Sequence, residues 1–301
     1  MKNKIDVIIP TFNRPKSISN VVSSILPQLK DNDAIYVVWH GSQKPLIKEN
    51  YKVHIIHCKP PYSLPRLRNF GIKAGCGDIL VFLDDDIEAG ENLLEAHRES
   101  YFSLKIGAVA GRIIDPYFKL EENRNSFFDE KTGYLLQNFC KEESGPAISV
   151  MGANMSFRRS ALEEIGAFDE NFLKIANFEE VDAAFRIRNA GYEIWYNSKA
   201  IVKHLREESG GCRIKSKTKN IFYMFLNTAY FASRYAPKKY LNSWLTYWKY
   251  RLEYETRSKV LWFKHNPFWV LAGIIGAAIG IFRYILFGIK IKIDKKKLFN
   301  V

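Results

Sequence analysis

The chain has 301 residues, of which 47% are hydrophobic and 26% charged, and this ordinary globular composition excludes a disordered or collagen-like protein. The formal net charge is +13, but it is unevenly spread: residues 1–204 carry 26 basic and 27 acidic side chains, whereas residues 205–301 carry 19 and 5. The sequence therefore predicts a nearly neutral body of one large or two modest domains, followed by a strongly basic segment.

The cysteines and the N-terminal residues bear on where the protein works. Four cysteines are scattered without the spacing of a zinc site or a disulfide framework, so reduced thiols in the cytoplasm are expected. The apolar run Val7–Ile9 ends at Pro10 and is too short for the core of a signal peptide. We expect the body to stay on the cytoplasmic side of the membrane.

Short apolar runs alternate with helical periodicity along the first part of the chain. Strands are predicted at Ile5–Ile9, Ala34–Val38, Val53–His57 and Ile79–Leu83, and helices at residues 18–29 and at Leu64–Ala74. Buried strands that alternate with helices predict an α/β fold with a mostly parallel sheet. Ligands bind at the carboxyl ends of such strands, where Pro10–Arg14 and Asp84–Asp86 both lie.

Further along the chain, the pattern is interrupted and then resumes. The stretch Pro116–Pro146 is polar, acidic and irregular, which predicts a surface insertion over the site. The other predicted elements are a strand at Ala108–Ile114, helices at Arg159–Ile165 and Glu180–Ala190, and strands at Tyr192–Tyr196 and Ala200–Lys203.

Three consecutive aspartates, Asp84, Asp85 and Asp86, follow an apolar strand and form the sharpest local feature of the sequence. A solvated turn would explain them, but neighbouring like charges repel and are better tolerated when a cation compensates them. Side chains alternate along an extended segment, so Asp84 and Asp86 point the same way. Mn²⁺ and Mg²⁺ take such oxygen ligands and bridge them to phosphates, so the pattern indicates either ion as a cofactor.

A second acidic group, Glu179, Glu180 and Asp182, opens a predicted helix. The helix dipole stabilises acids at this position, so helix capping alone would explain them. Neighbouring carboxylates also raise one another's pKa, which would let one of them act as a general base near neutral pH. His204, at the end of a predicted strand, is either structural or a metal ligand.

Several segments in register carry a resemblance to a known family. They are Val7–Arg14, Arg68–Ile72, Gly77–Asp86, Gly152–Arg159, Gly166–Asp169, and Glu179–Asp182 with Arg186 and Gly191-Tyr192. Over roughly residues 5–204 the chain resembles the inverting family 2 glycosyltransferases of the GT-A fold. The resemblance implies a Rossmann-like catalytic domain over residues 1–210, with nucleotide-sugar binding at about 1–110 and the acceptor side at about 111–210.

The resemblance also implies roles for individual residues. Residues expected to bind the nucleotide or its diphosphate are Pro10, Thr11, Asn13, Arg14, Arg68, Asn69, Asp84 and Asp85. Asp84 is expected near the ribose, whereas Asp86 and His204 are expected at the metal. The catalytic base is expected among Glu179, Glu180 and Asp182, with Glu180 preferred.

Two positions depart from the family pattern. The aspartate that usually recognises the base is absent from Val38-Trp39-His40-Gly41-Ser42, so we expect His40 or Trp39 to contact or stack on the base instead. The usual Glu-Asp pair is Glu179-Glu180 here, which leaves the base open among the three acids.

The region 211–301 is predicted to be helical, basic and rich in aromatic residues, and to associate with the membrane. Its apolar segment Pro267–Ile289 contains Arg283 and has lysines on both sides. Basic flanks favour the cytoplasmic side, and a single span cannot place both flanks there. Re-entrant or interfacial helices on the cytoplasmic face are therefore favoured over a single transmembrane span. A helical subdomain packed on the body is the alternative, and nucleic-acid binding would not explain the apolar segment.

The expected function is metal-dependent, inverting transfer of a sugar in glycan biosynthesis. The donor is expected to be a nucleotide sugar of the UDP or dTDP type, and the acceptor a hydroxyl of a lipid-linked or membrane-proximal glycan. The expected partners are thus these substrates and anionic lipid. The alternatives are a nucleotidyltransferase and a membrane-bound nucleotide- or sugar-binding protein without catalysis.

Overall fold

The computed structural model describes residues 3–115, 124–129, 135–174, 176–207, 210–211, 214, 216–235 and 267–288. Parts of the predicted 116–146 insertion lie outside these ranges. So do the aromatic-rich stretch 236–266 and the lysines between residues 290 and 297.

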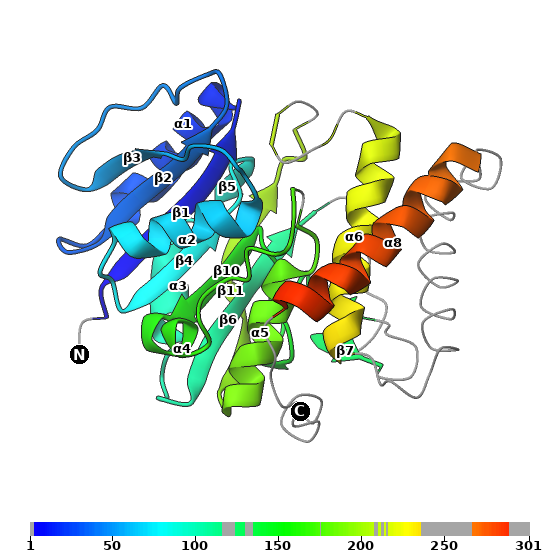
Figure 1. Ribbon diagram of the computed structural model, residues 1–301. Helices are drawn as coiled ribbons and strands as arrows, with labels where there is room; N and C mark the ends of the chain where they lie inside the picture. Colours follow the sequence, from blue (N-terminus) through cyan, green and yellow to red (C-terminus); the bar gives the residue numbers. More distant parts are fainter. Residues whose placement is uncertain are drawn as a thin grey trace.

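Nine strands of the described chain form one mixed sheet, in the order β3-β2-β1-β4-β10-β6-β11-β5 with β9 paired to β11 (Figure 1). They are β1 Ile5–Phe12, β2 Ala34–His40, β3 Val53–His57, β4 Ile79–Leu83, β5 Ile87–Ala89, β6 Ile106–Ile114, β9 Gly145–Ala147, β10 Asn154–Arg158 and β11 Glu193–His204. All run the same way except β5, β9 and β10, which are antiparallel to their neighbours. The predicted α/β fold with a mostly parallel sheet is therefore confirmed.

Helices cover both faces of this sheet. They are α1 Pro15–Ile25, the 3₁₀ helix η1 Leu26–Gln28, α2 Leu64–Ala74, α3 Leu93–Glu99, α4 Arg159–Glu164 and α5 Glu179–Ala190. Because successive side chains of a strand point to opposite faces, Val7 and Ile9 pack with α1 and α3, whereas Ile8 packs with α2, α4 and α5. The two cores fix the strand ends rigidly, and β1, β4, β6 and β11 all end at one edge of the sheet.

Two predictions about the second half of the chain are corrected. The strands predicted at Tyr192–Tyr196 and Ala200–Lys203 are one continuous strand, β11, with an irregular register against β6 between Asn197 and Ile201. The 116–146 stretch was predicted to be a surface insertion, but parts of it are ordered into strands and buried. Its described parts include β9, the small sheet of β7 Ser126–Phe128 and β8 Leu135–Gln137, and the fully buried Phe139.

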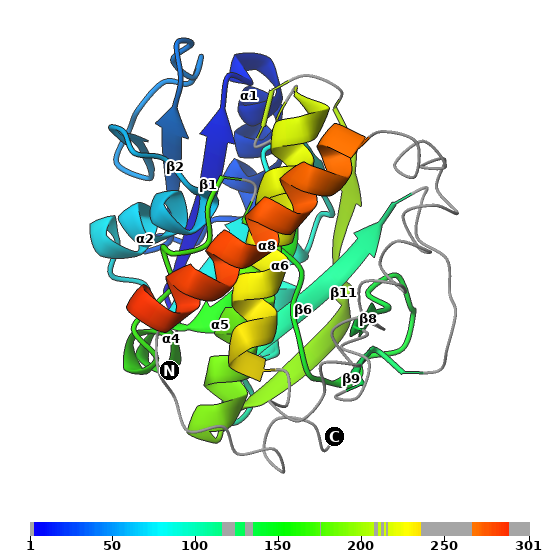
Figure 2. The same ribbon diagram turned by 45° about the vertical axis from the view of Figure 1, so that its right-hand side comes forward.

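Two C-terminal helices, α6 Lys217–Tyr235 and α8 Pro267–Phe287, pack side by side next to α5 (Figure 2). The aromatic rings of Tyr230, Phe231 and Tyr235 from α6 share a buried cluster with Phe185 of α5. This cluster joins residues from both sides of the boundary predicted near residue 210, and α6 packs on the body as in the helical subdomain that the sequence offered as an alternative. None of the described helices is both long and apolar enough to cross a membrane.

Candidate active site

A cavity of about 430 Å³ opens at the edge where β1, β4 and β11 end. Seven of the residues predicted from the sequence line it: Pro10, Thr11, Arg14, Asp84, Asp85, Asp86 and His204. These residues come from three distant parts of the chain. They meet because parallel strands bring their carboxyl ends to the same edge.

Asp84, Asp86 and His204 form a cluster whose potential ligand atoms all lie within 4.8 Å of one another. His204 Nε2 lies 3.2 Å from Asp86 Oδ1, while Nδ1 lies 3.1 Å from Asp115 Oδ2. Burial alone would lower the pKa of His204, but the hydrogen bond to Asp86 and the charges of Asp84 and Asp86 outweigh it and raise the pKa. Two carboxylates and an imidazole oriented by a further carboxylate make a donor set that suits Mn²⁺ or Mg²⁺.

Arg14 holds the loop of Asp84–Asp86 in place. Its Nη1 donates to Asp85 Oδ1 at 2.5 Å and lies 3.1 Å from Asp86 Oδ2, and Nη2 donates to the backbone oxygen of Glu207. Thr11 Oγ1 donates to the other oxygen of Asp85 at 2.6 Å. Burial raises the pKa of Asp85 to about 6 despite these partners. Asp85 thus holds the loop in place, while Asp84 and Asp86 form the cluster with His204.

Glu180 does not line the cavity, but its electrostatics are linked to those of Asp84, which does. Burial raises the pKa of Glu180 and the charge of Asp84 raises it further, while the guanidinium of Arg68 opposes both effects. Burial likewise raises the pKa of Asp84, again opposed by Arg68. The charge of Arg68 therefore acts on both acids.

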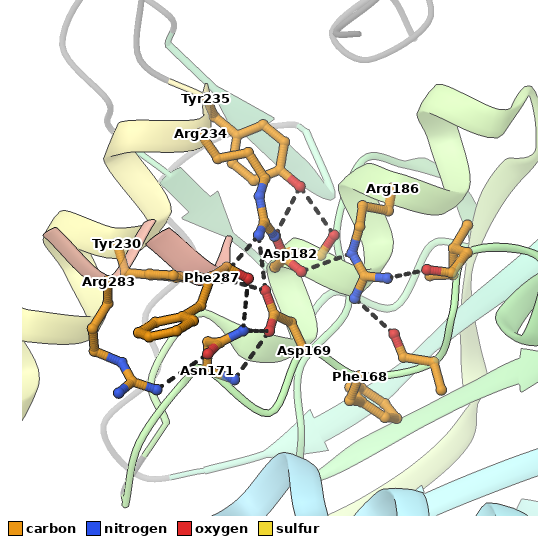
Figure 3. A network of polar contacts seen from close by, with 12 residues as sticks. Phe168, Asp169, Asn171, Asp182, Arg186, Tyr230, Arg234, Tyr235, Arg283 and Phe287 are labelled. Atoms are coloured by element: carbon orange, nitrogen blue, oxygen red, sulfur yellow. Dashed lines mark hydrogen bonds and ion pairs between the residues drawn. The ribbon is translucent and has the colours of Figure 1, made fainter. Parts of the chain in front are cut away.

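The other two acids of the 179–182 group, Glu179 and Asp182, are held in buried ion pairs. Glu179 is fully buried and forms an ion pair with Arg68, which is equally buried. Gly152 makes room for this arginine, because a Cβ there would lie 2.7 Å from Arg68 Nη2. Asp182 points into the protein, where it pairs with Arg186 and with Arg234 of α6 (Figure 3). Of the three candidates for a general base, Glu179 and Asp182 are buried in ion pairs, whereas Glu180 is partly exposed.

Four predicted nucleotide-binding residues do not line the cavity, and other contacts hold each of them: Asn13, His40, Arg68 and Asn69. Arg68 is held in its ion pair with Glu179. Asn13 Oδ1 accepts hydrogen bonds from the backbone N–H groups of Ser42 and Gln43, so it holds the loop after β2. Asn69 uses its whole amide to brace the loop at Phe168 and Glu170.

His40 is buried between two aromatic rings. Its ring centroid lies 4.4 Å from that of Phe12 and 4.0 Å from that of Tyr62, in stacked geometry. It has no free face on which a base could stack, and burial lowers its pKa to about 4. Trp39 stacks on His57 with centroids 4.3 Å apart, so its contact with a base stays a prediction.

Three residues that support the site were not predicted from the sequence. Asp115 holds His204 and also accepts a 2.6 Å hydrogen bond from Arg206 Nε, and Arg206 lines the cavity. Asp115 directly follows β6, so the strand-end rule that singled out Asp84–Asp86 would have found it. Arg234 gave no comparable signal, because its partners Asp169 and Asp182 are distant in sequence.

The sequence profile of the family described as "Glycosyl transferase family 2" matches residues 6–166, which is more than half of the chain. The chain belongs to glycosyltransferase family 2. The matched range contains the β1 loop, Arg68 and the three aspartates, and the fold and the edge cavity agree with the GT-A arrangement that the resemblance implied.

Named relatives show the range of this family. A glucosyl-dolichyl phosphate glucuronosyltransferase of Haloferax volcanii is 24% identical over 217 residues, which cover 67% of this chain and 69% of the relative. The O-antigen chain rhamnosyltransferase RfbN of Salmonella typhimurium is 25% identical over 210 residues, or 67% and 66% of the two chains.

Two solved structures share the fold. The mannosyltransferase PcManGT of Pyrobaculum calidifontis, in complex with GDP-Man and Mn²⁺, is 11% identical with a TM-score of 0.55, over 95% of this chain and 88% of that one. GalNAc-T7 with UDP, GalNAc and Mn²⁺ is 17% identical with a TM-score of 0.59, over 77% of this chain. The match spans about half the length of GalNAc-T7, 50% of that chain.

Proposed function

We propose that this glycosyltransferase transfers a sugar from a UDP- or dTDP-type nucleotide sugar to a hydroxyl of a lipid-linked or membrane-proximal glycan, with inversion at the anomeric carbon. The observation that carries the proposal is the cluster of Asp84, Asp86 and His204 at the cavity. Arg68 connects Glu180 to this cluster, because it pairs with the neighbouring Glu179 and its charge acts on both Glu180 and Asp84.

Asp86 and His204 would hold a divalent cation, with Asp84 beside them at the ribose or as a further ligand. A bound Mn²⁺ or Mg²⁺ supplies Lewis-acid stabilisation of the charge that develops on the departing diphosphate. Asp115 supports this assignment, because its contact with Nδ1 of His204 leaves Nε2 directed at Asp86. Mn²⁺ is also present in the two structures that share the fold.

Glu180 would act as the general base. Its carboxylate takes the proton of the acceptor hydroxyl while the hydroxyl oxygen forms a bond to the anomeric carbon of the donor sugar. The bond from that carbon to the diphosphate oxygen breaks, and the nucleoside diphosphate leaves with the electron pair. A raised pKa suits this role, because a base is most effective when its pKa lies near the working pH.

The proposed acceptor class has support from a relative and from the fold. The Haloferax relative bears a name that places its acceptor on dolichyl phosphate, a lipid. In the present structure Ile214 and Asn220, at the start of α6, line the cavity, and α6 carries the apolar helix α8. A lipid-linked hydroxyl would thus approach the cavity from the side of the C-terminal helices.

The proposal is tested by incubating the purified protein with Mn²⁺, a panel of nucleotide sugars and a membrane glycolipid extract, and measuring the nucleotide released. Acceptor-dependent release of nucleoside diphosphate is expected, and it should be lost in Asp86→Asn. Release of nucleoside monophosphate or pyrophosphate would instead show nucleotidyl transfer. Binding of a nucleotide sugar without any release would show a binding protein.

A further inference from the structure

α8 turns several of its small residues toward α6 and several of its large apolar residues outward. Gly276 and Gly280 face α6 so closely that a Cβ at either position would collide with a backbone oxygen, that of Phe222 or of Leu226. Gly273 lies against the ring of Phe225, and Ala277 is buried at the same contact. These small residues let the two helix backbones approach each other.

The opposite side of α8 is a continuous apolar surface. We call it the α8 outer face and define it by residues spaced three, four or seven apart on one side of the helix: Leu271, Ile274, Ile275, Phe282 and Ile285. Ile274 is 61% exposed and Phe282 is 59% exposed, and the other three are also among the exposed large hydrophobic side chains. Figure 2 shows α8 crossing in front of α6 on the outside of the molecule.

This orientation is the reverse of that expected for a helix in water. A surface helix of a soluble protein normally turns its large apolar side chains to the core and its polar side chains to solvent. Close packing through small residues, with large apolar side chains outward, is the pattern of helices whose outer surroundings are lipid. A contiguous apolar surface of this kind also marks an interaction site.

We propose that the α8 outer face docks the enzyme on an anionic lipid bilayer, with α8 lying along the surface. Among the described residues, α6 covers the inner side of the helix, which leaves the outer face available to acyl chains. Charge favours the same partner, since the segment 205–301 carries 19 basic and 5 acidic residues and two exposed lysines, Lys217 and Lys219, open α6. Basic residues beside an apolar helix face add electrostatic attraction to anionic headgroups.

The docked helix would lie beside the cavity. Asn220 lines the cavity, and Phe222, which follows it on α6, contacts Gly276 in the middle of α8. The far end of α8 is joined to the body, because Arg283 donates to Asn171 Oδ1 at 3.2 Å and Asn171 Nδ2 donates to the backbone oxygen of Phe287 (Figure 3). The inference deepens the proposed function, since it brings a lipid-linked acceptor to the cavity, but it is measurable without turnover.

The test is flotation of the full chain with phosphatidylcholine vesicles and with mixed phosphatidylcholine–phosphatidylglycerol vesicles. We expect the wild-type protein to float with the mixed vesicles and less with phosphatidylcholine alone. The triple variant Leu271→Gln, Ile274→Gln, Phe282→Gln should lose at least about tenfold in partitioning, because each change removes apolar surface from the bilayer contact. These side chains are exposed, so the variant should retain its far-ultraviolet circular dichroism and its thermal midpoint.

A matched control removes as many exposed apolar side chains elsewhere, in Leu46→Gln, Tyr51→Gln, Leu104→Gln, and should float like the wild type. Equal flotation of the two triple variants would overturn the inference, as would a wild-type protein that does not float. A fall in oligomeric state of the α8 variant by light scattering, with flotation unchanged, would assign the face to a second copy of the chain. Glycosyl transfer to a soluble acceptor analogue reports on the proposed function separately, so either idea can fail alone.

Discussion

The three acids in the first turn of α5, Glu179, Glu180 and Asp182, have different environments and different roles. Glu179 and Asp182 are fully buried and ion-paired with Arg68 and Arg186, so they stabilise the turn rather than meet a substrate. Glu180 lies between these two buried acids and is partly exposed, and burial together with the charge of Asp84 raises its pKa. The three acids could be named from the sequence, but which of them is free to act as a base could not be derived from it. That depends on arginines from α2 and α6, which pair with the other two acids.

The first prediction concerns Glu180→Gln. Removal of a general base should lower kcat by about 10²- to 10⁴-fold while the affinity for the nucleotide changes little, since the amide keeps the size of the side chain. Steady-state release of nucleoside diphosphate and a direct binding measurement check the two parts. Glu91→Gln, at an exposed glutamate of the same chain, serves as the matched control and should leave kcat unchanged. Full activity of Glu180→Gln would remove this residue from the chemistry.

The second prediction concerns pH. A base must be deprotonated to work, so activity is lost as the pH falls through the pKa of Glu180. Burial and the charge of Asp84 raise that pKa above the 4.5 of an ordinary glutamate, so the acid limb of kcat/KM should lie at a correspondingly higher pH. A pH profile at saturating Mn²⁺ measures the limb. An inflection at or below 4.5 would contradict the environment described for Glu180.

The family pattern predicted the position of some site residues but not of others. Asp84, Asp86 and His204 were found from strand ends and the resemblance, and they do converge. Asn69 and His40 were expected at the nucleotide, but hydrogen bonding to the Phe168 loop and stacking between two rings occupy them. These are tertiary contacts with residues distant in sequence, and a short motif does not predict them.

At the scale of elements, α5 and α6 are joined by buried charges rather than by apolar packing alone. Arg234 of α6 pairs with Asp182 of α5, and its Nη2 donates to Asp169 Oδ2 at 2.8 Å. Tyr235 Oη donates to Asp182 Oδ1 at 2.9 Å and completes the network (Figure 3). The helix α5, which begins at Glu179 and carries Glu180, is therefore fixed by a helix that the sequence assigned to a separate region.

The third prediction tests this link with Arg234→Met. Breaking a buried ion pair leaves uncompensated carboxylates, so the free energy of unfolding should fall by about 3–5 kcal/mol. Denaturant titration followed by circular dichroism measures the change. Lys219→Met, at an exposed cation of the same helix, should change stability by less than about 0.5 kcal/mol. Equal stability of the two variants would show that the network does not join α6 to α5.

The elements that sequence patterns predicted best are those with a strong apolar run. Val53–His57, Leu64–Ala74 and Ile79–Leu83 have the predicted bounds. β10 was missed because Asn154–Arg158 mixes polar and apolar residues. Its polar side chains are satisfied inside the fold, where Asn154 donates to the backbone oxygens of Arg112 and Ala200.

At the scale of the whole molecule, the fold has to bring together groups from distant parts of the chain. The end of β1 with Arg14, the aspartates after β4 and His204 at the end of β11 meet at one edge, because the strands that carry them are held parallel in one sheet. The α/β alternation made that edge predictable. The position of α6 and α8 was not predictable, because it depends on the buried pairs of Arg234 and on glycine contacts.

The most direct test of the central claim is the affinity for nucleoside diphosphate, measured calorimetrically with and without Mn²⁺ for the wild type, Asp86→Asn and Glu180→Gln. UDP, dTDP and GDP are compared first, and the tightest binder is used. We expect Mn²⁺ to strengthen binding to the wild type and to Glu180→Gln alike, and Asp86→Asn to lose about tenfold or more of that gain. Binding of equal strength in all three proteins, whether or not Mn²⁺ is present, would contradict a metal-dependent diphosphate site at this edge of the sheet.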